Sequence, residues 1–263
     1  MSSLFTRILV AAVLLPPVLL LIWTGGWWLF GLAAVVSVLA LHEFYGMTRE
    51  LRPVLLAGYA GTIAALVGAE WGPQWALAGF LSTFAYSFVF KGMAGVRPTT
   101  VSTAATVLGV AWIGLGLAHV LFIREIPEHG VLAAFTVLLT VFVCDTAAFV
   151  AGRLFGRHKL APRTSPGKTW EGLVAGTVAA ILVPFFTLYE EGFLTIPQSL
   201  ALGAAIAVAA PMGDLFESAL KRDAGVKDTG RLLLGHGGIL DRLDALLFAA
   251  VVSYYLLAAF GVT

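Results

Sequence analysis

The sequence predicts an all-α integral membrane protein with about nine transmembrane helices. Of its 263 residues, 59% are hydrophobic and only 12% are charged, and the mean hydropathy is +0.93. A typical water-soluble domain carries about twice that share of charged residues. The apolar residues fall into long runs, and the charged residues gather in the segments between them. Together these observations indicate a chain that crosses the bilayer repeatedly.

The apolar runs have roughly the length that a spanning helix needs, because about 30 Å of hydrocarbon takes about 20 residues at 1.5 Å each. Charged residues, Gly or Pro bound the runs. The predicted helices cover residues 8–23, 27–47, 54–69, 75–90, 101–123, 131–151, 171–189, 200–217 and 240–260.

The basic residues predict the orientation of the chain. When the connecting segments are numbered alternately, all of the 16 Lys and Arg residues except Arg124 fall on one side. Because cytoplasmic loops carry the excess of Lys and Arg, we expect a cytoplasmic N-terminus and a C-terminus outside. We predict a single membrane-embedded domain over residues 1–263, with its active site formed by the cytoplasmic loops 152–170 and 218–239 and the adjoining helix ends. The net charge of +1 provides no basic field for a nucleic-acid partner.

Four carboxylates lie at the cytoplasmic ends of the last two predicted helices. Asp214 and Glu217 are three residues apart, and Asp241 and Asp244 repeat that spacing, so each pair shares a helix face. If the two helices are neighbours, three or four carboxylates can meet around a divalent cation. Mg²⁺ suits such a site because it binds through one or two carboxylates together with substrate phosphates.

Structural ion pairs are the alternative explanation of these acids. Their partners would be Lys221, Arg222 or Arg242. Charged groups at the ends of membrane helices are costly where they only hold structure, which favours the metal interpretation.

Other acids lie within the apolar runs. Asp145 is deep in the predicted helix 131–151, and Glu217, already named at the end of the helix 200–217, is a possible intramembrane polar residue as well. An ionisable residue in a membrane segment is a candidate for function, with a buried ion pair as the alternative. Glu43 and His42, near the cytoplasmic end of the second helix, are weaker candidates of the same kind.

The segment between the acidic pairs is rich in glycine and charge. It contains Lys227 and Asp228 and then the run 235–238, Gly-His-Gly-Gly. Exposed backbone N–H groups in such a turn can form an anion-binding concavity. A glycine-rich turn before a helix is also often only a flexible connection. The sequence gives His236 no role in proton transfer.

The other basic loop contains Gly167, Lys168 and Thr169, which resemble the end of a P-loop. A P-loop needs a further glycine five residues before Gly167, where Pro162 stands, and it needs a preceding strand. Lys168 is therefore a candidate phosphate contact on the grounds of local charge. Alternatively, the loop fixes the topology and contacts anionic lipid headgroups.

The run from Ser218 to Asp244 closely resembles the signature of the phosphatidate cytidylyltransferases, the CDP-diacylglycerol synthases. The positions that carry this resemblance are Ser218, Lys221, Arg222, Lys227, Asp228, Gly230, His236, Gly237, Gly238, Asp241, Arg242, Leu243 and Asp244. The second motif of that family is similar to a run with Ser165, Pro166, Lys168, Thr169, Glu171 and Gly172. Leu234 departs from the family, which usually has Pro or Gly there, and the change affects only the local turn.

The resemblance implies an enzyme of the cell (inner) membrane that transfers CMP from CTP to phosphatidate, with CDP-diacylglycerol and pyrophosphate as products. We expect Asp214 and Asp241 to hold Mg²⁺ with Asp244 nearby, and we allow for a second cation and for a homodimer. The expected catalytic residues are Asp214, Asp241, Asp244, Lys227 and Asp228, and the expected substrate-binding residues are Ser165, Lys168, Thr169, Ser218, Lys221, Arg222, His236, Gly237, Gly238 and Arg242. No protein nucleophile is needed, because the lipid phosphate is already ionised.

Two other functions remain open at this point. One is a CTP-dependent enzyme that acts on another membrane lipid, such as an isoprenoid phosphate or a polyprenol. The other is a cation-coupled transporter, which would also place acids inside helices. Transporters usually hold their sites near the bilayer midplane between repeated halves, whereas this chain shows no repeat and most of its charge lies at one membrane edge.

Overall fold

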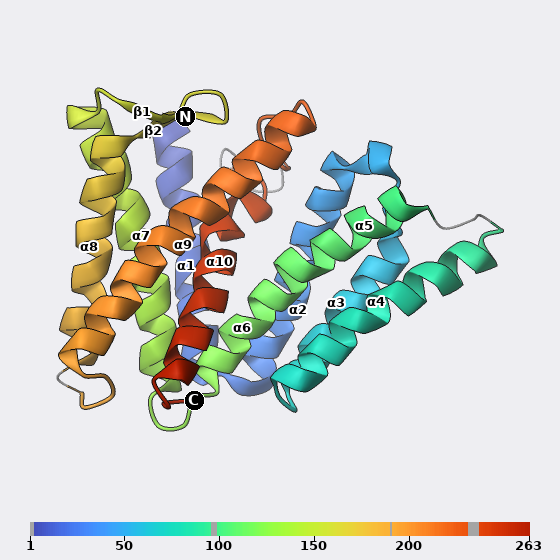
Figure 1. Ribbon diagram of the computed structural model, residues 1–263, viewed down its shortest axis with the longest axis horizontal. Coiled ribbons are helices and arrows are strands. Elements are labelled where there is room, and N and C mark those ends of the chain that lie inside the picture. The colour runs from blue at the N-terminus through green and yellow to red at the C-terminus, as the bar shows by residue number, and fades with distance from the viewer. Residues whose placement is uncertain (1–2, 96–98, 190, 231–236) are drawn as a thin grey trace. The chain divides into compact units, whose positions relative to one another are not determined.

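The computed structural model describes residues 3–95, 99–189, 191–230 and 237–263, which are almost entirely helical (Figure 1). The elements are α1 (Ser3–Thr24), α2 (Gly26–Met47), η1 (Arg49–Leu51), α3 (Leu55–Ala69), α4 (Pro73–Met93), α5 (Thr100–Gly109), η2 (Val110–Gly114), α6 (Leu115–Arg124), α7 (Gly130–Phe155), β1 (Lys159–Ala161), β2 (Ser165–Thr169), α8 (Trp170–Leu188), α9 (Ile196–Asp223) and α10 (Leu240–Ala259).

Each predicted apolar segment coincides with a helix. Among the described residues, seven helices are long and apolar enough to cross a membrane: α2, α4, the continuous run Thr100–Arg124, α7, α8, α9 and α10. Two further apolar helices are shorter, namely α3 and the Leu15–Thr24 part of α1. The prediction of a helical, multi-pass membrane protein is confirmed, whereas the count of about nine spans stays a prediction.

The helices group into two compact units. Unit 1 consists of Met1–Phe122 and Val226–Arg242, and unit 2 consists of Ile123–Gly225 and Leu243–Thr263. The boundary between Arg242 and Leu243 falls inside α10, so the first turn of this helix belongs to unit 1 and the remainder to unit 2. The expectation of one membrane-embedded domain stays a prediction.

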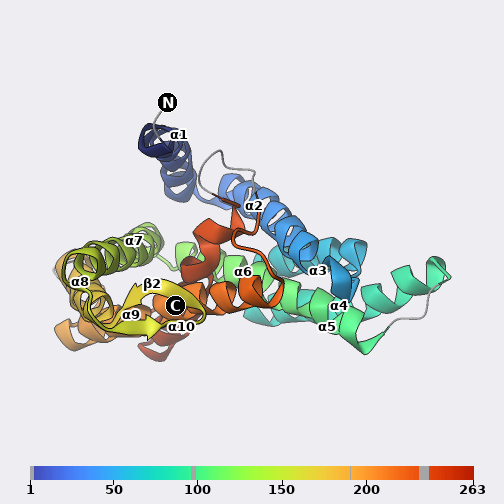
Figure 2. The ribbon, with the colours of Figure 1, turned by 90° about the horizontal axis from the view of Figure 1, so that it is seen from above.

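In unit 1, polar side chains and glycines join the helices. The Tyr45 hydroxyl on α2 donates to the Thr106 carbonyl on α5 at 2.8 Å, and both groups are buried. Helices α3 and α4 lie side by side (Figure 2). A Cβ at Gly79 of α4 would overlap the Ala64 carbonyl of α3. Small residues thus let these backbones approach closely, as is common between membrane helices.

Unit 2 is built around α7, α8 and α9, which pack against one another (Figure 2). Glycine again sets the spacing, because a Cβ at Gly176 of α8 would lie only 2.8 Å from the Cys144 carbonyl oxygen of α7. Farther along the same interface, Thr136 donates to the Thr187 hydroxyl at 3.0 Å. This packing holds the ends of α7, α8 and α9 together, and two of these helices carry predicted site residues.

A short β-hairpin connects α7 to α8, and the sequence analysis did not predict it. Strands β1 and β2 are antiparallel, with Lys159 opposite Thr169. The Trp170 amide extends the pairing by donating to the His158 carbonyl at 3.0 Å. Pro162 lies between the strands, where it cannot continue a helix. The hairpin therefore gives the basic loop a defined shape.

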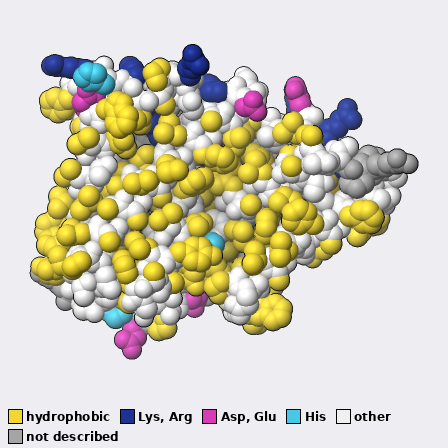
Figure 3. All heavy atoms as spheres, viewed as in Figure 1, with side chains coloured by type: hydrophobic (Ala, Val, Ile, Leu, Met, Phe, Trp, Pro, Cys, Tyr) yellow, Lys and Arg dark blue, Asp and Glu magenta, His cyan; other side chains and the backbone are white. Residues whose placement is uncertain are grey.

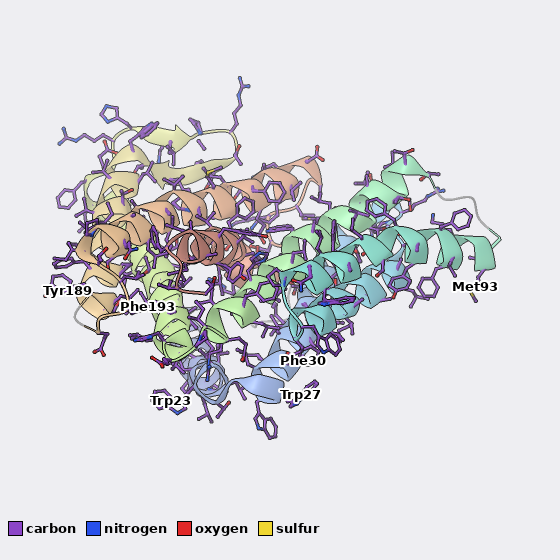
Figure 4. All side chains as sticks on the ribbon, turned by 60° about the horizontal axis from the view of Figure 1, so that its bottom comes forward. Trp23, Trp27, Phe30, Met93, Tyr189 and Phe193 are labelled. Carbon is purple, nitrogen blue, oxygen red and sulfur yellow. The ribbon has the colours of Figure 1, made fainter. Side chains whose placement is uncertain are left out.

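The outer flanks of both units are apolar. On α4 only Ala76, Thr83 and Ser87 are buried, and large hydrophobic side chains cover much of the rest. In Figure 3 yellow hydrophobic atoms cover the helix flanks, while Lys and Arg lie toward helix ends. At the α1–α2 turn, Trp23 and Trp27 project outward (Figure 4) with exposed fractions of 66% and 76%. Tryptophans at helix ends are typical of the membrane–water interface.

Candidate functional site

In unit 2, the hairpin and α9 bring opposite charges together. Lys168 extends from β2, and its ammonium lies 2.8 Å from Oδ2 of Asp214 on α9. The other carboxylate oxygen, Oδ1, accepts a hydrogen bond of 3.2 Å from Ser218, which is one helical turn farther along α9. Lys168 also donates to the Pro211 carbonyl at 3.4 Å. The hairpin thus positions a cation over the first predicted carboxylate.

A second ion pair lies deeper in the same unit. Glu217 is fully buried, and its Oε2 atom is 2.7 Å from the Lys221 ammonium on the next turn of α9. The Asp244 carboxyl group on α10 interacts electrostatically with Glu217 and Asp214. Three of the four predicted carboxylates are therefore neighbours, and two lysines stand beside them.

Gly213 allows α9 and α10 to approach at this point. A Cβ on Gly213 would overlap the Asp244 carbonyl and would lie 3.2 Å from Cα of Ala245. Close contact of the two backbones places Asp214, which follows Gly213, beside the helix that carries Asp244. The sequence analysis expected the carboxylates to come together only if α9 and α10 are neighbours. Within unit 2 the two helices are neighbours at Gly213.

Other predicted residues surround this cluster. Arg222 donates from Nε to the Thr164 carbonyl at 3.3 Å, which ties α9 to the turn of the hairpin. Asp145 on α7 interacts electrostatically with Asp214 and Lys168. Asp145 therefore belongs to the same charged region.

Unit 1 contains the remaining predicted carboxylate, Asp241. Its Oδ2 atom accepts hydrogen bonds from the Gly238 amide at 2.7 Å and from the Thr229 amide and hydroxyl at 3.1 and 3.0 Å. Gly237 has a φ of +79°, a conformation that favours glycine. Glu43 of α2 also enters this region and accepts hydrogen bonds from Thr229 and Leu240.

The structure assigns different environments to the other predicted residues. Thr169 is buried and caps α8, because its hydroxyl accepts from the Gly172 amide at 3.1 Å. Ser165 is half-buried at the start of β2. Lys227, Asp228 and Arg242 are exposed. The predictions for His236 and Leu234 lie outside the described residues.

The sequence analysis treated Glu43 as a weaker candidate and gave no role to Thr229, whereas the structure joins the two side chains by a hydrogen bond. An acid inside the apolar helix 27–47 was the available signal for Glu43. No local spacing links Glu43 to a loop almost two hundred residues farther along the chain. That link depends on tertiary packing.

The donor set fits a hard cation, because carboxylate oxygens are the ligands that Mg²⁺ prefers. Among the described residues, no group of three His, Cys, Asp or Glu side chains is arranged to hold a metal ion. Mg²⁺ does not require such a trio, since one or two carboxylates, substrate phosphates and water complete its shell. The expected placement of Asp241 with Asp214 on one Mg²⁺ stays a prediction.

The fold and this site define a multi-pass membrane protein with carboxylates near helix ends and lysines beside them, an arrangement suited to phosphate chemistry. Residues 5–260 match the Cytidylyltransferase family. The chain belongs to this family. It is 32% identical over 247 residues to a phosphatidate cytidylyltransferase of Staphylococcus haemolyticus (strain JCSC1435) and 33% identical to that of Staphylococcus aureus (strain COL). Both alignments cover 91% of this chain and 92% of the relative.

The environment of Thr169 predicts the effect of its substitution. Thr169→Val removes the helix cap and should lower the free energy of unfolding by about 1 kcal/mol. Thr169→Ser keeps the hydroxyl and serves as the control. Thermal unfolding of the purified protein in detergent measures the difference. Equal midpoints for the valine and serine variants would show that the cap contributes nothing.

Proposed function

We propose that this protein transfers CMP from CTP to phosphatidate, forming CDP-diacylglycerol and pyrophosphate. The observation that carries the proposal is the charged cluster of unit 2, in which Asp214, Glu217 and Asp244 lie beside Lys168 and Lys221. Membership of the cytidylyltransferase family and similarity to the phosphatidate cytidylyltransferases of two staphylococci support the choice of reaction. The substrates are CTP and phosphatidate in the bilayer.

The reaction needs a nucleophile, an electrophilic phosphorus and a leaving group. A phosphate oxygen of phosphatidate attacks the α-phosphorus of CTP, and the bond between that phosphorus and the oxygen bridging to the β-phosphate breaks. Pyrophosphate leaves with the bonding electron pair. The attacking oxygen is already ionised, so the protein contributes mainly orientation and charge stabilisation. No covalent bond to the protein forms.

The basic residues of unit 2 are suited to binding the phosphates. Lys168 is held near Asp214 on a defined hairpin, and its side chain is only 23% exposed. Its ammonium can therefore neutralise phosphate charge in partly desolvated surroundings, where electrostatic interactions are stronger than in water. Arg222, which is tied to the hairpin turn, adds a second cation at the exposed edge. Lys221 balances the buried charge of Glu217.

Asp214 and Asp244 are the carboxylates of unit 2 that would hold Mg²⁺, and we retain Asp241 as a further ligand. When bound, the ion would stabilise the charge that develops on the phosphate oxygens. The chain itself orients these carboxylates, because Ser218 donates to Asp214 and the Ala245 amide donates to Asp244 at 2.8 Å. A second cation and a homodimer remain compatible with this proposal.

We also propose that the site faces the cytoplasm of a bacterial cell membrane. The distribution of Lys and Arg favours this orientation, since the basic hairpin and the basic C-terminal end of α9 both fall on the predicted cytoplasmic side. CTP is a soluble nucleotide and would enter from that side, while phosphatidate would enter laterally from the bilayer.

Activity measurements test the proposed reaction. Purified protein in detergent, supplied with labelled CTP, phosphatidate and Mg²⁺, should form CDP-diacylglycerol, and EDTA should stop the reaction until Mg²⁺ is restored. Asp214→Asn and Asp244→Asn should each lower kcat/KM by about 10²-fold, because each removes charge stabilisation.

Glu125→Gln is the matched control, since it removes an exposed carboxylate from the opposite loop. It should turn over as the unaltered protein does. Normal turnover of Asp244→Asn would disprove the role of that carboxylate. Turnover of only another lipid, such as an isoprenoid phosphate or polyprenol, would disprove phosphatidate as the substrate.

Cysteine labelling tests the orientation. Cys144 is buried, and a Cys144→Ala background leaves no native cysteine. In this background Arg157→Cys should react with a membrane-impermeant maleimide in inside-out vesicles, and Glu125→Cys should react in right-side-out vesicles. The reverse pattern would contradict a cytoplasmic site.

A further inference from the structure

Asp145 is an acid in the interior of α7 to which the proposed reaction assigns no role. Helix α7 is a candidate membrane span, and Asp145 lies ten residues before its end at Phe155. The residue is exposed in the structure. An ionisable group in a membrane span is costly unless specific partners compensate it, so the partners of Asp145 indicate what it does.

The charged partners of Asp145 are Lys168 and Asp214, with which it interacts electrostatically. Lys168 also interacts electrostatically with Cys144, the residue that precedes Asp145 on α7. All four residues belong to unit 2. Two carboxylates thus share one ammonium group, which forms its ion pair of 2.8 Å with Asp214. These three groups carry one negative charge in excess.

The packing of α7 against the hairpin explains why Asp145 and Lys168 lie in the same region. Gly152 and Gly156 follow Asp145 by about two and three helical turns, so they share its face of α7. A Cβ at Gly152 would lie 2.9 Å from the Thr169 hydroxyl oxygen, and one at Gly156 would lie 2.7 Å from the Thr169 Cγ2 atom. The face of α7 that carries Asp145 therefore packs against the strand that carries Lys168.

Strand β2 spans the distance between α7 and α9. Neighbouring side chains of a strand point to opposite sides, so Lys168 extends away from Thr169. Its ammonium meets α9 at the Asp214 carboxylate and the Pro211 carbonyl. A lysine carries a compact charge on a flexible four-carbon stem. The ammonium can therefore change partners while the strand stays in place.

Both carboxylate oxygens of Asp214 are engaged in the structure. Oδ2 pairs with Lys168, and Oδ1 accepts a hydrogen bond from Ser218. A divalent cation bound to Asp214 would repel the ammonium at the same carboxylate, because like charges at such short range destabilise each other. Asp145 is the other acid that interacts with this ammonium. It is therefore placed to receive the ammonium when a cation arrives.

We propose that Asp145 is a positioning residue that takes the Lys168 ammonium from Asp214 when a divalent cation binds, so that the Asp214 carboxylate becomes available to the cation. The inference rests on the proposed function, because it takes Asp214 as a ligand of Mg²⁺. Asp145 acts through Lys168 and touches neither the cation nor the substrates. Its loss leaves Lys168 on Asp214 and weakens cation binding through that competition.

Cation binding without substrates tests the competition. Electron paramagnetic resonance follows the binding of Mn²⁺ alone to the purified protein in detergent. Asp145→Asn should weaken Mn²⁺ binding about tenfold, because the ammonium then has Asp214 as its remaining partner. Lys168→Met removes the competing ammonium, so the addition of Asp145→Asn to Lys168→Met should change the Mn²⁺ affinity by about twofold at most.

Three results of this measurement would overturn the proposal. A loss of about tenfold in both backgrounds would mean that Asp145 acts on the cation directly. An unchanged Mn²⁺ affinity in Asp145→Asn alone would mean that it has no effect on the cation. Absence of Mn²⁺ binding to the unaltered protein would remove the competition itself.

Two control variants accompany the binding measurement. Asp145→Glu keeps the negative charge and should bind Mn²⁺ within about twofold of the unaltered protein. Glu125→Gln removes an exposed acid of the same unit and should leave the Mn²⁺ affinity unchanged. A loss in Asp145→Glu equal to that in Asp145→Asn would contradict a role for the charge.

The magnesium dependence of turnover separates positioning from a structural defect. Asp145→Asn should raise the Mg²⁺ concentration for half-maximal rate about tenfold and should leave kcat at saturating Mg²⁺ within about twofold. A kcat lowered equally at every Mg²⁺ concentration would contradict the proposal, since it would report only less active enzyme. Failure of the unaltered protein to convert CTP and phosphatidate would disprove the proposed reaction, whereas the Mn²⁺ measurement would still decide the role of Asp145.

Discussion

The site of unit 2 depends on the pairing of a buried acid, Glu217, and a half-buried acid, Asp214, with lysines. An unpaired carboxylate near hydrocarbon costs several kcal/mol, and removal of one partner from a buried pair is strongly destabilising. Glu217 has no exposed surface and is compensated by Lys221, whereas Asp214 is compensated by Lys168. The Asp214–Lys168 pair also joins the β-hairpin to α9, so the same interaction that stabilises the acid gives the basic loop its position.

Glycine makes the acidic cluster geometrically possible. The missing side chain at Gly213 brings the α9 backbone against α10 beside Asp244. In unit 1 the missing side chains at Gly230 and Gly238 bring the motif loop against Glu43. Both regions thus combine a close backbone approach with a carboxylate that organises its surroundings. The described residues Thr229 and Gly238 on either side of 231–236 are each held by a hydrogen bond to Asp241.

The sequence was sufficient to predict the helices and part of the cluster. Spanning helices follow from hydrophobicity and length, and the grouping of Asp214 with Glu217 follows from their spacing on one helix. The pairing of Lys168 with Asp214 was not predictable, because it requires the hairpin to fold over α9. The hairpin itself escaped prediction because its strands are very short and β2 contains Pro and Gly. The cap role of Thr169 and the contact of Glu43 with Leu240 likewise depend on tertiary structure.

The most direct test of the central claim is cation binding by the acidic cluster, measured without turnover. Electron paramagnetic resonance can follow the binding of Mn²⁺, used in place of Mg²⁺, to the purified protein with a non-hydrolysable CTP analogue. We predict that Asp244→Asn weakens Mn²⁺ binding at least tenfold, while Glu125→Gln leaves it unchanged. Equal Mn²⁺ affinity in the Asp244→Asn variant and the unaltered protein would contradict the account.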